Sequence, residues 1–204
     1  ALLNEYLTEM SRIALAYGAT IDKYVGDAIM IFFGDPVSHG VKVDALSCVQ
    51  MAMEMQVRLK ELSASWTDYG LVEPLQCRIG IATGFCTVGN FGSEDRMDYT
   101  IIGGVVNLAS RLESIVEPGH ILISAETHNL VHEEISCKEH EMVKVKGIAY
   151  PVKTYQVSVD NVDSGRATGQ ISVLPGKLTV DMDMAAMSAE DRKKASVVLR
   201  DLAK

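Results

Sequence analysis

The chain has 204 residues, of which 48% are hydrophobic and 23% charged, which is typical of a globular protein that can bury a core. Its formal net charge of −8 disfavours general nucleic-acid binding, because phosphate contacts need a clustered basic surface. The longest apolar run, residues 28–33, is far shorter than the about 20 residues of a membrane span, and no secretory signal is evident. Four cysteines without CxxC spacing indicate reduced, buried thiols in a cytoplasmic protein.

The chain opens within an amphipathic helix whose apolar side chains recur at helical spacing as far as Gly18, which can end a helix. No capping residue precedes this helix, so we expect the chain to be a piece of a longer one. Two β-rich runs, residues 20–25 and 28–33, then flank Gly26 and Asp27. A two-residue turn of this composition between such runs predicts a β-hairpin.

The rest of the first 159 residues alternates between helical and strand-like patterns. Further helices are predicted over residues 45–62, 105–115 and 126–132, a loop over 89–93, and strands over 76–83, 85–88, 99–102, 121–124, 142–146 and 153–159. This order predicts an α+β fold in which helices cover one face of a sheet. A strand before Ala1 would complete the β-α-β-β-α-β order of ferredoxin-like folds.

The composition changes after residue 159. Residues 160–169 are polar and contain glycine, which predicts a linker. We therefore expect one domain over residues 1–159 and a small appendage over residues 160–204. Within the appendage, residues 171–173 and 178–180 suit a strand pair, and Ser188 can cap a last helix.

Two residues of the predicted hairpin could carry chemistry. A carboxylate on a rigid turn, such as Asp27, is well placed to hold a hard cation such as magnesium, although turn geometry alone also explains an Asp there. Strict alternation places Lys23 on the same strand face as Ile21 and Val25. A lysine among apolar neighbours is either a stem lying along an apolar surface or a placed hydrogen-bond donor.

Two further pairs of polar residues could bind phosphate. Asn107 and Arg111 are four residues apart, so they share one face of a predicted helix, where an amide and a guanidinium could grip a phosphate. Lys144 and Lys146 point the same way if they lie on one strand. A solvated polar surface is the ordinary alternative for both pairs.

These signals occur together in an order that resembles the catalytic domain of class III nucleotide cyclases. Residues 21–30 (IDKYVGDAIM) resemble the metal-binding hairpin of that family, and residues 78–84 (RIGIATG) and 88–92 (VGNFG) its next strands and loop. Residues 98–103 (DYTIIG) with 106–113 (VNLASRLE) are similar to its most diagnostic run. The resemblance covers about residues 1–158, and the subtype is similar to bacterial adenylate cyclases.

The resemblance implies roles for individual residues. Asp27 would be the second of two metal-binding aspartates, and Lys23 and Thr100 would read the adenine edge. Asn107 would orient the ribose or the reacting groups, and Arg111 would stabilise phosphate charge in the transition state. The terminal phosphates would bind to Lys144, with Lys146 as the alternative.

The resemblance also implies a reaction, cofactors and partners. ATP would be converted to 3′,5′-cyclic AMP and pyrophosphate with two Mg²⁺ (or Mn²⁺) ions per site. One chain carries both halves of the site, which favours a homodimer with shared sites. An upstream regulatory domain is expected, together with the first strand and its metal-binding aspartate, which the sequence lacks.

Three alternatives stay open. A guanylate cyclase usually has an acid in place of Lys23 and a smaller residue or a thiol in place of Thr100. A non-catalytic regulatory domain that only dimerises is favoured by the missing first strand and opposed by Asp27, Asn107 and Arg111. A diguanylate cyclase is disfavoured because acidic residues of its signature are absent after Gly103.

Overall fold

The computed structural model describes residues 2–66, 73–144, 151–159, 168–174 and 178–183. The chain divides into two compact units, residues 1–159 and 160–204. In chain order, the elements of the first unit are α1 (Leu2–Ala16), β1 (Thr20–Val25), β2 (Ala28–Phe32), α2 (Val41–Trp66), β3 (Ile79–Ile81), β4 (Thr87–Ser93), β5 (Arg96–Ile102), α3 (Gly104–Ile115), β6 (Ile121–Ser124), α4 (Ala125–Val131), β7 (Cys137–Val143) and β8 (Val152–Val157). The second unit contains β9 (Thr168–Leu174) and β10 (Leu178–Asp183), which pair antiparallel. The helix expected after Ser188 lies outside the described residues.

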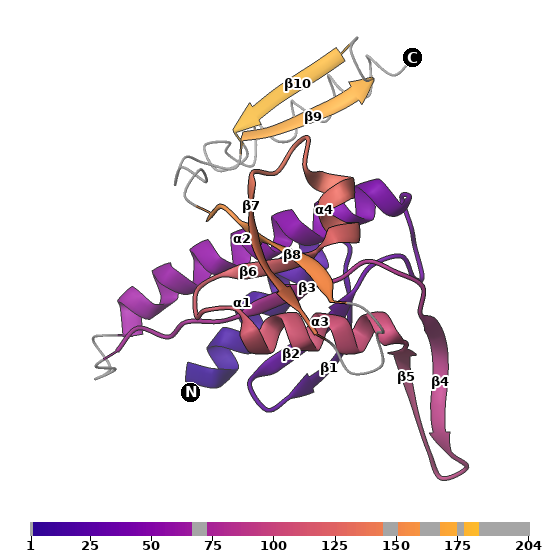
Figure 1. The fold of residues 1–204 in the computed structure, drawn as a ribbon. Helices are drawn as coiled ribbons and strands as arrows, with labels where there is room; N and C mark the ends of the chain where they lie inside the picture. Colours follow the sequence, from indigo (N-terminus) through magenta and orange to yellow (C-terminus); the bar gives the residue numbers. More distant parts are fainter. Residues whose placement is uncertain (1, 67–72, 145–150, 160–167, 175–177, 184–204) are drawn as a thin grey trace, which may run out of the picture. The chain divides into compact units, whose positions relative to one another are not determined.

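A mixed sheet in the order β3-β6-β8-β7 forms the centre of the first unit (Figure 1). Strands β3 and β6 are parallel, whereas β8 pairs antiparallel with both β6 and β7. All four residues of β6 are buried, and they alternate between two faces. Ile121 and Ile123 pack in the cluster with α2 and α4, whereas Leu122 packs with α3. Helices therefore cover both faces of this sheet, and the prediction of one covered face was wrong.

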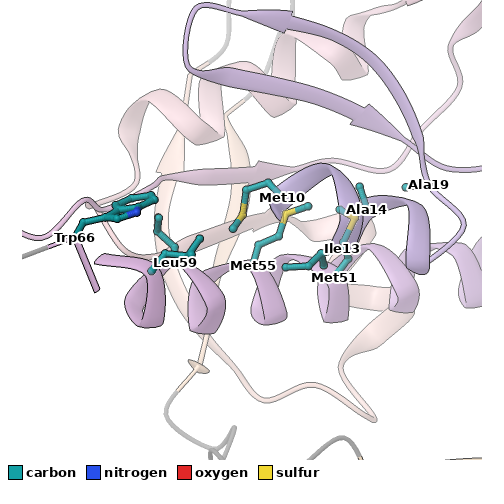
Figure 2. Packing of buried hydrophobic residues seen from close by; sticks show 9 residues of the cluster. Met10, Ile13, Ala14, Ala19, Met51, Met55, Leu59 and Trp66 are labelled. Atoms are coloured by element: carbon teal, nitrogen blue, oxygen red, sulfur yellow. The ribbon is translucent and has the colours of Figure 1, made fainter. Parts of the chain in front are cut away.

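Helices α1 and α2 build a separate hydrophobic cluster. Figure 2 shows Met10 and Ile13 of α1 facing Met51 and Met55 of α2. Fully buried Trp66 ends α2, and its indole N–H donates to the carboxylate of Glu5 at 3.0 Å. This cluster also takes in the partly buried Ile21, Ile29 and Ile31, so it fixes the β1–β2 hairpin to the helices.

The predicted β1–β2 hairpin is present, and the strands differ from the prediction in two places. β1 and β2 pair antiparallel around Gly26, which adopts a φ of 66° that glycine tolerates without steric cost. The register shifts between Ile21 and Lys23, so Asp22 is bulged out of the ladder. Strict alternation along β1 therefore fails, and the inference that Lys23 shares a face with Ile21 was wrong. Residues 89–93, expected as a loop, belong to β4 and pair with β5.

Helix α3 lies unusually close to strand β3. A Cβ atom on Gly80 would overlap the backbone carbonyl oxygen of Ala109 and the backbone nitrogen of Glu113. Because both obstacles belong to the backbone, they cannot move aside as a flexible side chain can. Glycine at position 80 therefore sets the distance of α3 from the sheet.

The close packing at Gly80 predicts the effect of one substitution. Gly80→Ala should lower the free energy of unfolding by about 1–3 kcal/mol, because the added methyl group forces α3 away from β3. The measurement is urea-induced unfolding of the variant. Gly104→Ala is the matched control: no atom lies within 4 Å of its Cβ position, and alanine favours helix by up to about 1 kcal/mol. Equal stability of the two variants would contradict this account of the packing.

Candidate active site

One buried carboxylate joins the β1–β2 hairpin to strand β5. The side chain of Asp22 is 0% exposed, and its Oδ2 accepts hydrogen bonds from Thr100 Oγ1 at 2.6 Å and from the backbone N–H of Ile101 at 3.1 Å. The Lys23 ammonium lies 3.2 Å from the other oxygen, Oδ1, close enough for an ion pair but outside hydrogen-bond geometry. Two predicted site residues, Lys23 and Thr100, therefore meet at a third that the sequence did not single out.

A second carboxylate makes a parallel link. Asp35 follows β2 and accepts a short hydrogen bond from the hydroxyl of Tyr99 on β5. This bond raises the pKa of Tyr99 above its ordinary value. The backbone carbonyl of Asp35 also accepts from Thr20 Oγ1 at 2.6 Å, which ties it to the start of β1. Adjacent residues of β5, Tyr99 and Thr100, are thus both fixed to the first hairpin.

Lys23 and Thr100 differ in their access to solvent. The Lys23 side chain is 43% exposed, whereas Thr100 is 8% exposed and opens on the surface only through a small area. An ammonium beside a hydroxyl can address the hydrogen-bonding edge of a planar heterocycle. Reading of a base by Lys23 and Thr100 stays a prediction.

Asp27 occupies the tip of the β1–β2 hairpin and is exposed. It lies near Tyr6 of α1, whose pKa is raised first by burial and then by the charges of Cys77 and Asp27. Among the residues that the structure describes, no group of three or more His, Cys, Asp or Glu side chains could hold a metal ion. The single carboxylate of Asp27 is still compatible with a magnesium ion, since magnesium is often held by one or two carboxylates together with substrate phosphates.

Asn107 and Arg111 lie on the exposed side of α3, while Leu108 and Leu112 of the same helix are buried. In the described ranges neither polar side chain takes part in a hydrogen bond or an ion pair. Their amide and guanidinium donors are therefore available to a ligand. No hydrogen bond or ion pair in the described part joins them to Lys23, Thr100 or Asp27.

Lys144 follows directly after β7, which ends at Val143. The prediction that Lys144 lies on a strand was therefore wrong, although its side chain is exposed and could reach a phosphate. The alternative phosphate ligand, Lys146, lies outside the described residues. All four cysteines are free; Cys86 is exposed and the other three are partly buried, so the expectation of four buried thiols was wrong.

The sequence carries one signal for Asp22. An acidic residue lies within a β-rich run whose neighbours include Ile21, Tyr24 and Val25, and a carboxylate that becomes buried in a strand needs partners. The residue pattern gave no indication of the bulge that turns Asp22 inward.

None of the helices in the described part has an apolar stretch long enough to cross a bilayer.

Comparison with known proteins gives concordant matches. Residues 1–159 match the family described as adenylate and guanylate cyclase catalytic domain. The crystal structure of the adenylyl cyclase CyaB from P. aeruginosa shares 55% identity and a TM-score of 0.75, covering 81% of this chain and 82% of that one. The guanylyl cyclase Cya2 shares 38% identity and a TM-score of 0.71, covering 76% of this chain and 78% of that one.

Curated relatives match as well, over small parts of their length. The terminal-differentiation-specific adenylate cyclase of Dictyostelium discoideum is 32% identical over 85% of this chain, which spans 8% of that protein. The adenylate cyclase of Anabaena cylindrica is 32% identical over 76% of this chain, which spans 31% of that protein.

The surroundings of the candidate residues predict which substitutions disturb folding. Asn107→Ala and Arg111→Ala should each change the free energy of unfolding by no more than about 0.5 kcal/mol, because both side chains are exposed and make no bonds within the described part. Asp22→Ala should lower it by about 1–3 kcal/mol, since a buried hydroxyl and a buried N–H lose their acceptor. Urea denaturation monitored by circular dichroism measures all three. A large loss for Arg111→Ala would show that this side chain supports the fold.

Proposed function

The chain belongs to the family of adenylate and guanylate cyclase catalytic domains, and from that premise we propose that it is an adenylate cyclase domain that converts ATP to 3′,5′-cyclic AMP and pyrophosphate. The 55% identity with an adenylyl cyclase of P. aeruginosa supports this activity. The observation that carries the proposal is the meeting of Lys23 and Thr100 at Asp22, across a sequence separation of 78 residues between Asp22 and Thr100.

The base is read by Lys23 and Thr100. Adenine presents an amino group and an adjacent ring nitrogen that accepts a hydrogen bond. The exposed ammonium of Lys23 donates to the ring nitrogen, and the hydroxyl of Thr100 meets the amino group. Fixed by Asp22, the two side chains hold these positions before the nucleotide arrives, which reduces the entropy lost on binding.

The triphosphate is held by residues that lie outside this pair. Asp27 offers a carboxylate for Mg²⁺ or Mn²⁺, and two such ions bound with the substrate would activate the attacking oxygen and neutralise phosphate charge. Lys144 contributes a cation to the terminal phosphates. Arg111 provides a forked donor for the phosphate oxygens as charge develops on them.

The reaction is a displacement at the α-phosphorus. The ribose 3′-hydroxyl gives its proton to solvent and its oxygen forms a bond to the α-phosphorus, while the bond from that phosphorus to the oxygen of pyrophosphate breaks. Asn107 holds the ribose or the reacting groups in line for this attack. Positioning and electrostatic stabilisation supply the catalysis, and no covalent intermediate with the protein is needed.

Two chains share each site in this proposal. Asn107 and Arg111 of one chain lie without polar partners in the described part, as does the exposed turn carrying Asp27. Large apolar side chains are also exposed on the linked strands β1 and β5, namely Tyr24, Val25, Met97, Tyr99 and Ile102. Exposed apolar surface of this kind suits an interface, and a symmetric homodimer completes two equivalent sites.

The proposal also covers the origin of the fold and the limits of the catalytic unit. The order α1-β1-β2-α2-β3 supports a ferredoxin-like β-α-β-β-α-β origin for this half of the domain. We place the reaction in residues 1–159 and treat residues 160–204 as an appendage outside the site.

Guanylate cyclase activity is the second candidate, since a guanylyl cyclase shares 38% identity with this chain. A lysine at position 23 opposes it. The ring nitrogen of guanine at the corresponding position carries a proton, and an ammonium has no lone pair to receive it.

Base selectivity tests the proposal. The catalytic domain in its full-length protein should turn over ATP at least tenfold more efficiently than GTP, because a mismatched polar contact costs about 1–3 kcal/mol. Lys23→Glu should reduce ATP turnover and weaken the discrimination. The measurement is kcat/KM for both nucleotides with Mg²⁺ and with Mn²⁺. Equal efficiency with ATP and GTP in the unmutated enzyme would reject adenylate specificity.

Sharing of sites between chains has its own test. Asp27→Ala and Arg111→Ala should each reduce turnover by about 10²–10³-fold or more. In a heterodimer of the two variants, one site carries both lesions and the other carries neither. Mixing them should therefore restore part of the activity, increasingly at protein concentrations that favour the dimer. Verified heterodimers that stay as inactive as either parent would show that each site is built within one chain.

A further inference from the structure

The hydrogen-bond donors around Asp22 determine which atom carries the proton between Asp22 and Thr100. Oδ2 accepts from Thr100 Oγ1 at 2.6 Å and from the Ile101 N–H at 3.1 Å, and the side chain is fully buried. An ionised carboxylate only accepts hydrogen bonds, so the proton in the 2.6 Å contact belongs to the threonine. The short distance is that of a charge-assisted bond.

This bond determines what Thr100 can offer a ligand. A hydroxyl has one proton and two lone pairs, so a threonine that donates to a carboxylate can only accept from a second partner. Lys23, with three N–H donors and no lone pair, can only donate. The two side chains thus form a pair of fixed and opposite polarity, one acceptor and one donor.

We propose that Asp22 sets nucleotide selectivity by fixing the Thr100 hydroxyl as a hydrogen-bond acceptor beside the donor Lys23. The inference rests on the proposed function and makes Asp22 a positioning residue that acts through Thr100. The structure supplies the means: the register shift between Ile21 and Lys23 takes Asp22 out of the β1–β2 ladder, so its carboxylate is free to reach β5.

The fixed polarity matches one purine and mismatches the other. The amino group of adenine donates to Thr100, and its ring nitrogen accepts from Lys23. Guanine presents a carbonyl oxygen and a protonated ring nitrogen in those places, so lone pairs face Thr100 and a proton faces Lys23. To donate to the guanine carbonyl, Thr100 would have to leave a buried carboxylate that keeps only the Ile101 N–H on Oδ2, and such a loss is costly.

The experiment compares Asp22→Ala, Thr100→Val, Thr100→Ser and the double variant Asp22→Ala/Thr100→Val. For each, kcat/KM and the dissociation constant are measured for ATP, GTP and purine riboside triphosphate, which lacks the amino group of adenine. The unmutated protein should prefer ATP to purine riboside triphosphate about tenfold or more. Thr100→Val should lose most of that preference, and Thr100→Ser should keep it.

Asp22→Ala should shift the ATP-to-GTP ratio toward GTP by about tenfold. Alanine removes the oxygen that accepts from Thr100, so the hydroxyl can turn its proton toward the nucleotide. In the Thr100→Val background the same change should leave the ratio unaltered, because the hydroxyl through which Asp22 acts is gone. A residue that only supports the fold would lower the efficiency with all three nucleotides equally, in both backgrounds.

The outcomes separate the two proposals. An unmutated enzyme that prefers GTP or lacks selectivity rejects adenylate specificity itself. An unmutated enzyme that prefers ATP, with the same ATP-to-GTP ratio after Asp22→Ala, overturns the role given to Asp22. Should Asp22→Ala fail to fold, the valine and serine variants at position 100 still decide it, since retention by Thr100→Val of the preference for ATP over purine riboside triphosphate contradicts the proposal.

Discussion

A carboxylate buried between two hairpins is the interaction on which the candidate site depends. Asp22 accepts from a hydroxyl and an N–H of β5, 78 and 79 residues along the chain, while the ammonium of the next residue lies beside it. Burying this charge is unfavourable unless it is compensated, and two of the compensating groups, Thr100 and Lys23, are those proposed to read the base. The stability of the hairpin contact and the geometry of recognition therefore rest on the same atoms.

A second constraint acts on helix α3. Because Gly80 lets the helix backbone lie against β3, the buried side of α3 is fixed by Leu108 and Leu112 and its opposite side is presented outward. Asn107 and Arg111 occupy that outward side. The sheet thus positions the two polar side chains without contacting them, which leaves their donors available to a ligand.

Sequence patterns predicted much of this arrangement. Helical spacing located α1 to α4, and the Gly26–Asp27 turn located the first hairpin, since both signals are local. The larger part of β4, residues 89–93, was predicted as a loop because Gly89 and Gly92 are typical of loops, although both pair with β5. The bulge at Asp22 and the close approach at Gly80 depend on partners far along the chain, so no local pattern could show them.

The position of Lys23 beside the buried carboxylate limits how such a site can change in evolution. The ammonium and Asp22 Oδ1 are 3.2 Å apart, so an acid at position 23 would bring two carboxylates together, a pairing that strongly opposes the ionisation of both. A lineage that replaced the lysine first would pass through a poorly folded or unselective ancestor. The two neighbouring codons are therefore expected to change together.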